Sequence, residues 1–454
     1  MSTLKKVLKK ILPVLILLPL AIGTTGYLIA GEMLADSLYA SFALYFVNPV
    51  SDEYNLYVEI ARWTAPLVTA TTILCALQSV WESLRDRLHL LGKKDRVAVY
   101  SDEQCDISFG RDVGAIYPGE KFRRYADSHI IMFSSDKKSL QFYEDHREDL
   151  AGKDVYVGIR DVECILLDHL NKVTLFDVNG AIARLLWKDI ALWNRGMDDC
   201  DIVIYGNSNL AGDIVCAGLQ LNLFSLRQKV RYHIITDNKP FQTRHSDIKL
   251  MNDDEMHFYD TDHSDIWSVI SSADLVIVAD ILEAGLMQTI VVKAGESPIY
   301  YYSQDEGDLA SFISYGSLIP FGRNDLVFTD DNIRRKKLIR KAIALNEYYA
   351  DKYGTEKEWD SLTGFLKASN ISASDFGEVL AALSESSEED ELARLEHIRW
   401  CRFHYLNYYT LGTPDNGKSR DDKRRIHKDL VAYEELDPAE QLKDIESIRI
   451  TRNL

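Results

Sequence analysis

The sequence DIVIYGNSNLAGDIV at residues 201–215 decides the fold of the central part of the chain. Its β-branched residues stop at Gly206, and an apolar pattern with helical spacing follows the glycine-containing turn. A second apolar run, VRYHIITD at residues 230–237, ends in Asp237. A strand, a glycine turn, a helix and a second strand that ends in an acid form the unit with which Rossmann-type domains bind dinucleotides.

The turn matches the dinucleotide pattern in part. Gly206 and Ala211 stand at the first and third positions of G-x-G-x-x-G/A, whereas Ser208 replaces the second glycine. That glycine lets the backbone approach the pyrophosphate, so a serine either crowds this group or donates its hydroxyl to it. We expect a cofactor site at Gly206, Ser208, Ala211, Gly212 and Asp237 for NAD(H) or another nucleotide. A Rossmann-like lobe that has lost its cofactor fits the sequence equally well.

Length and composition bound the protein class. A chain of 454 residues has room for about three domains, and its net charge of -18 argues against a nucleic-acid-binding body. The six cysteines are scattered without a C-x-x-C pair, which predicts neither a zinc site nor a disulfide framework. No Ser/His/Asp or Cys/His arrangement emerges from the sequence, so we predict no catalytic residues and no metal site. We therefore expect that the protein is not an enzyme.

The first ~90 residues predict two membrane crossings. Four lysines precede an uncharged apolar run of about 20 residues, Ile11–Ala30, which has the length of a membrane helix. A cleaved signal peptide is the rival interpretation, but this run is longer than a usual signal core and a second apolar segment, Trp63–Trp81, follows. The basic flanks place both termini in the cytoplasm, and we predict a two-helix protein of the inner (plasma) membrane with the lipid bilayer as partner.

The segment between the two crossings predicts a short amphipathic helix, because Leu34, Leu38, Phe42 and Phe46 recur every four residues. Two membrane helices around a short helix, joined to a cytoplasmic Rossmann-like unit, resemble potassium channels with regulator-of-conductance (TrkA-N-like) domains. The resemblance implies ion transport by a homo-oligomer, a dimer or tetramer. No T-V-G-Y-G filter occurs in this segment, and an interfacial helix with an acidic loop is an equal alternative.

Two α/β lobes are predicted after the membrane module. In the first, RVAVY (96–100), HIIMF (129–133) and DVYVGI (154–159) are strands, but no glycine turn follows residue 100, so we expect a structural lobe. Val173–Trp187 is predicted to be a linking helix. ADLVIVA (273–279) and PIYYY (298–302) continue the second lobe, and Asp280 is expected to cap the helix that follows it rather than face the ligand crevice.

The last quarter of the chain resembles the Ryr domain, the helical repeat of ryanodine receptors that also occurs in many bacterial proteins. The positions that carry this resemblance are Asn346–Tyr349, Trp359, Leu362, Glu391–Trp400, Arg402–His404, Arg424, Ile426, His427, Leu430, Val431 and Tyr433–Leu436. The resemblance implies an all-helical, non-enzymatic domain that senses nucleotide-derived ligands.

Aromatic and cationic residues of this region suit a phosphate-bearing ligand. On a helix, Trp400 and His404 recur with Glu396 at four-residue steps, and two arginines lie beside them. The expected ligand residues are Trp359, Arg399, Trp400, Arg402, His404, Arg424 and His427. In the alternative, the tryptophans form the core of a small domain and Glu396 pairs with Arg399 or His397.

These assignments predict a membrane module at 1–92, a first, degenerate Rossmann-like lobe at 93–195, a second at 196–332 and a Ryr domain at 333–454. The leading hypothesis is a cytoplasmic sensor of a nucleotide-type ligand that gates or regulates an ion-conducting pore. The alternative is a non-conducting anchored sensor or scaffold, including an effector in nucleotide-signalled anti-phage defence. A dehydrogenase is disfavoured because no acid or base stands beside the strand ends.

Overall fold

The computed structural model describes the backbone of residues 2–52, 55–102, 106–163, 167, 173–245, 248–304, 317–334, 336–384, 387–415 and 417–453. Side chains at 2–15, 75, 76, 79, 336 and 453 are outside this description. The chain divides into two compact units, Met1–Gly92 and Lys93–Leu454.

The N-terminal unit consists of helices in the part of it that the structure describes. They are α1 (Ser2–Ile29), α2 (Leu34–Ala43), η1 (Leu44–Phe46) and α3 (Leu56–His89). The predicted short helix between the two long ones is therefore confirmed. Asn55 fixes the start of α3, because its side chain accepts from Val58 N at 3.0 Å and donates to the Gly26 carbonyl of α1 at 2.8 Å.

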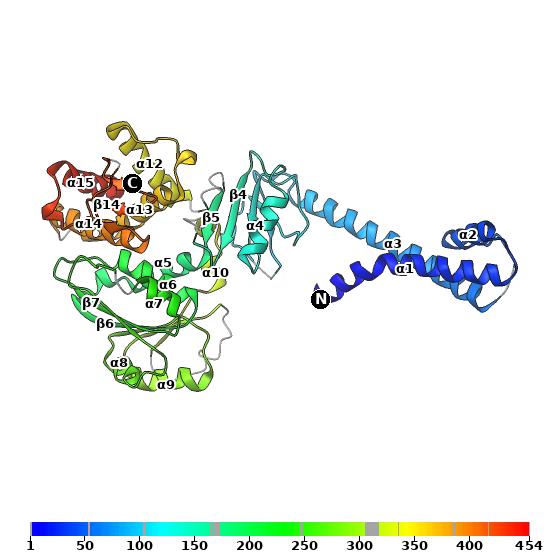
Figure 1. Cartoon of the computed structure of the whole chain (residues 1–454), viewed down its shortest axis with the longest axis horizontal. Helices are drawn as coiled ribbons and strands as arrows, with labels where there is room; N and C mark the ends of the chain where they lie inside the picture. Colours follow the sequence, from blue (N-terminus) through cyan, green and yellow to red (C-terminus); the bar gives the residue numbers. More distant parts are fainter. Residues whose placement is uncertain are drawn as a thin grey trace. The chain divides into compact units, whose positions relative to one another are not determined.

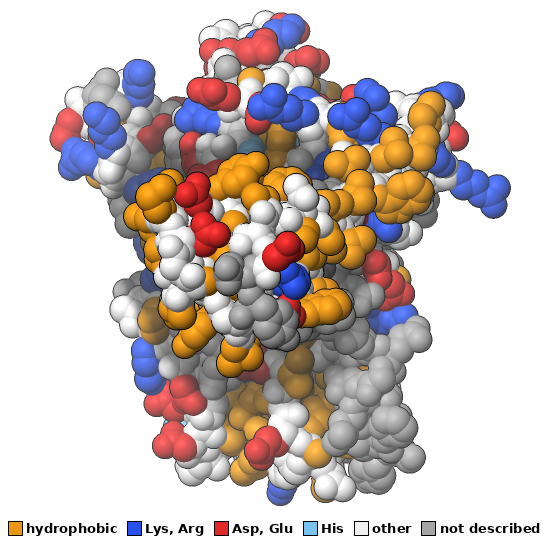
Figure 2. Space-filling view, turned by 90° about the vertical axis from the view of Figure 1, so that its right-hand side faces the viewer, with side chains coloured by type: hydrophobic (Ala, Val, Ile, Leu, Met, Phe, Trp, Pro, Cys, Tyr) orange, Lys and Arg blue, Asp and Glu red, His pale blue; other side chains and the backbone are white. Residues whose placement is uncertain are grey.

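Apolar side chains cover much of the surface of this unit (Figure 2). On α3, Trp63 is 71% exposed and Trp81 66% exposed, and the leucines between them are exposed as well. No helix in the described part of the chain is both long and apolar enough to cross a lipid bilayer. In the first predicted crossing, Ile11–Ala30, the structure describes the side chains from Ile16 onward. Both crossings stay predictions.

The first α/β lobe contains a five-stranded parallel sheet in the order β2-β1-β3-β4-β5. Its strands are β1 (Asp95–Tyr100), β2 (Val113–Ile116), β3 (Ser128–Ile131), β4 (Asp154–Ile159) and β5 (Thr174–Asp177). The three strands predicted from the sequence are present. The helix α4 (Asp136–Asp145) connects β3 to β4. The order reverses between β1 and β3, as in doubly wound sheets.

The second α/β lobe contains a six-stranded parallel sheet in the order β11-β10-β9-β6-β7-β8. Its strands are β6 (Asp199–Tyr205), β7 (Lys229–Ile235), β8 (Glu255–Tyr259), β9 (Leu275–Val278), β10 (Ile299–Tyr302) and β11 (Leu318–Phe321). Its helices include α6 (Asn209–Leu221), α7 (Lys239–His245), α8 (Ile266–Ser272), α9 (Ala284–Ala294), α10 (Asn324–Val327) and α11 (Asp330–Arg334). This is the Rossmann strand order, with its switch point between β6 and β9, and it confirms the two predicted Rossmann-like lobes.

The predicted linking helix at Val173–Trp187 is wrong in its first part. Residues Thr174–Asp177 form the edge strand β5, which pairs with β4, and the helix α5 runs from Val178 to Ile190. Asp177 marks the change, because its carboxylate accepts from the Gly180 amide at 2.8 Å and so caps the first turn of α5. The helix η4 (Leu192–Asn194) then leads into β6.

The C-terminal region is mostly helical. It contains α12 (Lys336–Tyr353), η6 (Trp359–Ser361), α13 (Gly364–Leu383), α14 (Glu389–Leu406), η7 (Tyr433–Glu435) and α15 (Pro438–Asn453). The expectation of an all-helical region is wrong in one detail. A three-stranded sheet, β12 (Thr410–Leu411), β13 (Arg420–Asp421) and β14 (Ile426–His427), lies between α14 and α15, where Gly412, Pro414 and Gly417 disfavour a helix.

One apolar core joins both sheets to the C-terminal helices. It contains Val97 and Phe176 of the first lobe, Ile204 of the second, and Phe376 and Leu395 of α13 and α14. The helices α5 and α6 lie between the second sheet and the C-terminal helices (Figure 1). Together, α5 and α6 therefore pack against the first lobe, the second lobe and the C-terminal region.

Candidate functional site

The glycines of the β6–α6 turn are required by close packing. A Cβ atom on Gly206 would lie 3.1 Å from Ala279 Cβ and from Asp280 Oδ1. A Cβ atom on Gly212 would lie 2.8 Å from the Phe241 ring. Ser208 precedes the first residue of α6, and Ala211 is buried. Close contact between turn, helix and neighbouring strand end explains these small residues without a ligand.

Asp280 occupies the position that the pattern assigns to a phosphate. Its carboxylate accepts from the Asn207 amide at 2.6 Å and from the Ser208 amide at 3.2 Å. The expectation that Asp280 caps the next helix is wrong, since no side chain caps α9 and Asp280 follows β9 at the switch point. A pyrophosphate at this turn would meet a carboxylate already bound to the amides it needs, so the residues in this arrangement do not fit a dinucleotide.

Asp237 is engaged as well. Its carboxylate accepts from the Thr261 amide at 3.0 Å and from the Thr261 hydroxyl, and these hydrogen bonds hold the pKa of Asp237 below its ordinary value. The Asp237 amide donates to the Asn207 side chain at 2.7 Å. The five predicted cofactor residues therefore lie at the β6–α6 turn, the first turn of α6 and the end of β7, where the polar groups bind one another.

Three of the predicted C-terminal ligand residues form an aromatic cluster. The rings of Trp400 and His404 are 4.1 Å apart, and the His427 ring is 4.9 Å from Trp400 and 5.3 Å from His404. Burial holds the pKa of His404 well below its ordinary value and lowers that of His427 to about 4. His404 Nδ1 donates to the Trp400 carbonyl, and its Nε2 is buried without a hydrogen-bond partner among the described residues.

The two arginines of α14 point into the protein. Arg399 donates to Glu396 at 2.7 and 2.8 Å and to Ser372 at 2.8 Å, and it is 1% exposed. Arg402 pairs with Asp254 of the second lobe at 2.7 Å, and both side chains are 0% exposed. The alternative of a Glu396–Arg399 pair is the one observed. In this arrangement neither guanidinium is exposed to solvent.

The other two predicted residues lie apart from the aromatic cluster. Arg424 is exposed on the surface and pairs with Asp415. Trp359, in η6, lines a cavity to which none of the other six residues belongs. The seven residues therefore do not converge on one site.

A Cys, a His and an Asp come together on α14 and α15, although the sequence analysis found no such arrangement. Cys401 Sγ lies 3.4 Å from His397 Nε2, and His397 Nδ1 lies 3.1 Å from Asp444. The spacing of four residues on one helix was the available signal. His397 Nε2 also donates to the Val431 carbonyl at 2.9 Å, so this nitrogen carries a proton and cannot accept one from the thiol. Burial raises the pKa of Cys401, which makes a nucleophilic thiolate unfavourable.

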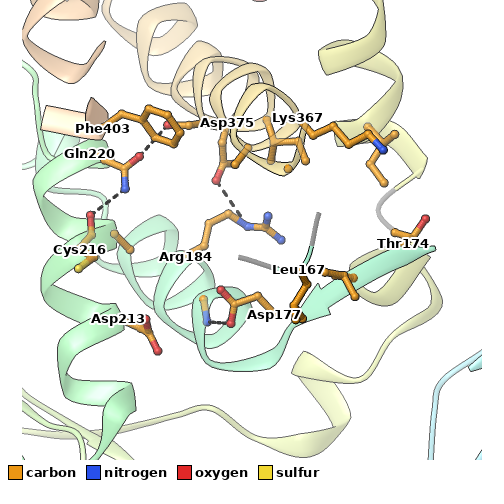
Figure 3. A pocket seen from close by; sticks show the side chains of 18 of the residues that line it. Leu167, Thr174, Asp177, Arg184, Asp213, Cys216, Gln220, Lys367, Asp375 and Phe403 are labelled. Atoms are coloured by element: carbon orange, nitrogen blue, oxygen red, sulfur yellow. Dashed lines mark hydrogen bonds and ion pairs between the residues drawn. The ribbon is translucent and has the colours of Figure 1, made fainter. Parts of the chain in front are cut away.

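A cavity of about 480 Å³ lies among α5, α6 and α13, which come from three different parts of the unit (Figure 3). Its aromatic side chains are Trp359 and Phe403. Its charged side chains are Asp177, Arg184, Asp213, Asp360, Lys367 and Asp375. The volume is within the usual range for small-molecule sites, roughly 300–1,000 Å³. Of the residues predicted from the sequence, only Trp359 belongs to it.

Asp213 contributes a carboxyl group whose protonated form is favoured in this cavity. Burial, followed by the nearby Asp177, raises the pKa of Asp213 well above its ordinary value. A protonated carboxyl can donate a hydrogen bond and adds no negative charge to the cavity wall. Asp213 and Arg184 are not among the residues predicted from the sequence, although Arg184 and Lys188 are cations four residues apart on the otherwise largely apolar helix α5.

Comparison with family models, curated proteins and solved structures finds no match to this chain. The resemblances to conductance-regulator domains and to the Ryr domain therefore stay predictions.

Proposed function

We propose that this chain is a sensor of a small nucleotide-type ligand, which binds in the cavity among α5, α6 and α13. The observation that carries the proposal is the position of the cavity. Both α/β lobes and the C-terminal region contribute to its walls, so a bound molecule contacts all three at once. A ligand that prefers one packing of these parts shifts their equilibrium toward it, which is the physical basis of a sensor.

The lining supports a ligand with a planar ring and a charged group. Trp359 and Phe403 offer ring surfaces for stacking, and Arg184 and Lys367 are cations on two different helices. Hydrogen-bonding groups on Gln220 and Ser372 lie in the same wall and bind each other at 2.7 Å. The β6–α6 turn is the weaker candidate because the Asp280 carboxylate already accepts from the Asn207 and Ser208 amides.

We further propose that the N-terminal unit anchors the sensor in the plasma membrane with both termini in the cytoplasm. The exposed apolar residues of α1, α2 and α3 support anchoring. Two helices per chain cannot enclose a pore, so ion conduction requires a homo-oligomer, a dimer or tetramer. The second candidate function is a non-conducting anchored sensor or scaffold, including a defence effector, and cation flux in reconstituted vesicles separates the two.

The first test is ligand-dependent thermal stability of the full-length chain in detergent with NAD, ADP-ribose, adenosine and a cyclic dinucleotide. A ligand at 100 times its dissociation constant adds about 2.7 kcal/mol to the stability of the native state. Three variants assign the site: Trp359→Leu for the cavity, Asp237→Ala for the region of the β6–α6 turn and Trp400→Leu for the aromatic cluster.

We expect a shift in the melting temperature that Trp359→Leu alone abolishes. Loss of the shift in Asp237→Ala or Trp400→Leu, with Trp359→Leu unaffected, would move the ligand to that other site. The absence of any shift in the parent chain with all four compounds would contradict a nucleotide-type ligand.

A further inference from the structure

Among the residues that the structure describes, Arg184 has an incomplete set of partners for a cation that is largely buried. Its side chain is 12% exposed, and the described residues offer it one ion pair, with Asp375 at 3.6 Å. A guanidinium carries five N–H donors, and in proteins it most often binds carboxylate or phosphate through two parallel hydrogen bonds. At 3.6 Å the contact with Asp375 is longer than such a hydrogen bond, and the side chain lies along the cavity wall (Figure 3).

Asp375 does not depend on Arg184 for its charge balance. Lys188, one helical turn further along α5, places its Nζ 2.7 Å from Asp375 and 2.5 Å from Glu378. Lys188 does not line the cavity. If Arg184 turned to another anion, Lys188 would still pair with Asp375, and the contact between α5 and α13 would remain.

The other carboxyl groups of the cavity oppose an anionic ligand only weakly. Asp177 accepts from the Gly180 amide at the start of α5, and burial raises the pKa of Asp213, which favours its uncharged form. Asp360 is exposed to solvent, which screens its charge. Lys367 on α13 adds a second cation to the lining.

We infer that Arg184 is the anion-binding residue of this cavity and that it takes the phosphate of the ligand in a bidentate contact. The inference rests on the proposed function and specifies it: the ligand is a nucleotide with a charged phosphate, and a nucleoside is insufficient. Because α5 connects the first sheet to the second and Asp375 belongs to α13, a phosphate on Arg184 exchanges one contact between α5 and α13 for a contact with the ligand. Binding is thereby coupled to the packing of the C-terminal region on the two lobes.

The test compares ADP-ribose with adenosine on the full-length chain in detergent, by titration calorimetry. The two probes share the adenine and ribose groups and differ in the pyrophosphate and its distal ribose. Arg184→Gln removes the proposed contact, and Lys188→Gln is the matched control, since it removes the neighbouring cation that pairs with Asp375 but is not part of the cavity wall. Arg184→Lys retains the charge and loses the bidentate geometry.

We expect ADP-ribose to bind the parent chain at least about 10-fold more tightly than adenosine, in line with a hydrogen bond between charged groups. Arg184→Gln should remove this difference by weakening ADP-ribose alone, Arg184→Lys should restore part of it, and Lys188→Gln should retain it. Equal affinities of the two probes, or an unchanged preference in Arg184→Gln, would overturn the inference and leave a cavity ligand in place. If neither probe binds the parent chain, the nucleotide proposal fails together with the inference.

Discussion

At the residue scale, the buried pair of Arg402 and Asp254 fastens the C-terminal region to the second lobe. Arg402 also donates to the Leu219 and Leu250 carbonyls at 2.9 and 2.8 Å, so its guanidinium is hydrogen-bonded to backbone as well as to Asp254. Removing the arginine leaves Asp254 buried without its counter-charge. We therefore expect Arg402→Met to lower the free energy of unfolding by about 3–5 kcal/mol, measured by chemical denaturation of the full-length chain.

The exposed pair of Arg424 and Asp415 provides the control for this prediction. Ion pairs in contact with solvent contribute little, so Arg424→Met should cost less than about 1 kcal/mol. Similar losses in Arg402→Met and Arg424→Met would mean that the buried pair does not fasten the two parts.

The raised pKa of His397 predicts that the stability of the protein depends on pH. Burial alone lowers the pKa of His397, but the hydrogen bonds with Asp444 and Cys401 outweigh it and raise the pKa to about 11. A histidine whose pKa is raised on folding stabilises the native state fully below its ordinary pKa of 6.5, and this contribution is lost as the pH rises toward about 11.

His397→Gln should therefore lower the free energy of unfolding near pH 6 by roughly 1–3 kcal/mol, because Asp444 loses a charged hydrogen-bond partner. Burial raises the pKa of Asp444, so its carboxyl can take up a proton in the variant, which limits the loss. The difference from the parent chain should shrink steadily between about pH 7 and about pH 10, since the charge of His397 contributes less there. Denaturation curves at several pH values measure it. A difference that is constant over this range would show that His397 is neutral in the folded protein.

At the element scale, Gly212 in the first turn of α6 is explained by close packing against Phe241 and requires no ligand. A Cβ on Gly212 would press against the Phe241 ring, whereas Gly285, in the first turn of α9, has open space around it. Gly212→Ala should destabilise the protein by about 1–3 kcal/mol through overpacking. Gly285→Ala should be neutral or should stabilise it by up to about 1 kcal/mol.

Thermal unfolding of the two glycine variants checks this prediction. A Gly212→Ala variant of unchanged stability would indicate that Phe241 moves aside easily and that the glycine is present for another reason.

The same elements show how far the sequence predicts the fold. The β-branched runs at β1, β6, β7 and β9 are buried central strands, so their patterns were unambiguous, and the Rossmann-like class followed from them. The outer strands β2, β5, β8 and β11 lack such a pattern, because each is only partly buried and so carries no continuous apolar run. In β5 the strand also runs directly into α5, which made the two elements look like one helix.

The candidate site was less predictable because its contacts are remote in the sequence. Spacing alone located the β6–α6 turn, but Asp280, which fills it, lies 73 residues from Asn207 in the chain. Arg402 and Asp254 are 148 residues apart, and no local pattern indicates that Arg402 is buried against another lobe. The cavity depends on how α5, α6 and α13 pack, so only Trp359 among its lining residues was anticipated.

At the scale of the whole molecule, a proposed route from the cavity to the N-terminal unit follows the covalent chain. Residues 90–94 alone separate the end of α3 at His89 from the start of β1 at Asp95. β1 lies between β2 and β3 inside the first sheet, so a movement of that lobe is passed to the connecting residues. A stiff, short connection is required for this route, and a long flexible one would absorb the movement.

We therefore expect that a flexible Gly-Ser insertion of about 12 residues between Gly92 and Lys93 leaves nucleotide binding intact but uncouples it from cation flux. Nucleotide affinity should stay within about 2-fold of the parent chain, because the cavity is unchanged, while ligand-dependent cation flux into vesicles should be lost. The same insertion between Gly295 and Glu296, in the turn from α9 to β10, controls for the added length and should leave both binding and flux intact.

A flux response that survives the insertion after Gly92 would rule out this covalent route. No ligand-dependent flux in the parent chain, with nucleotide binding retained, would instead favour the non-conducting sensor, because the cavity would then signal through the packing of the C-terminal region.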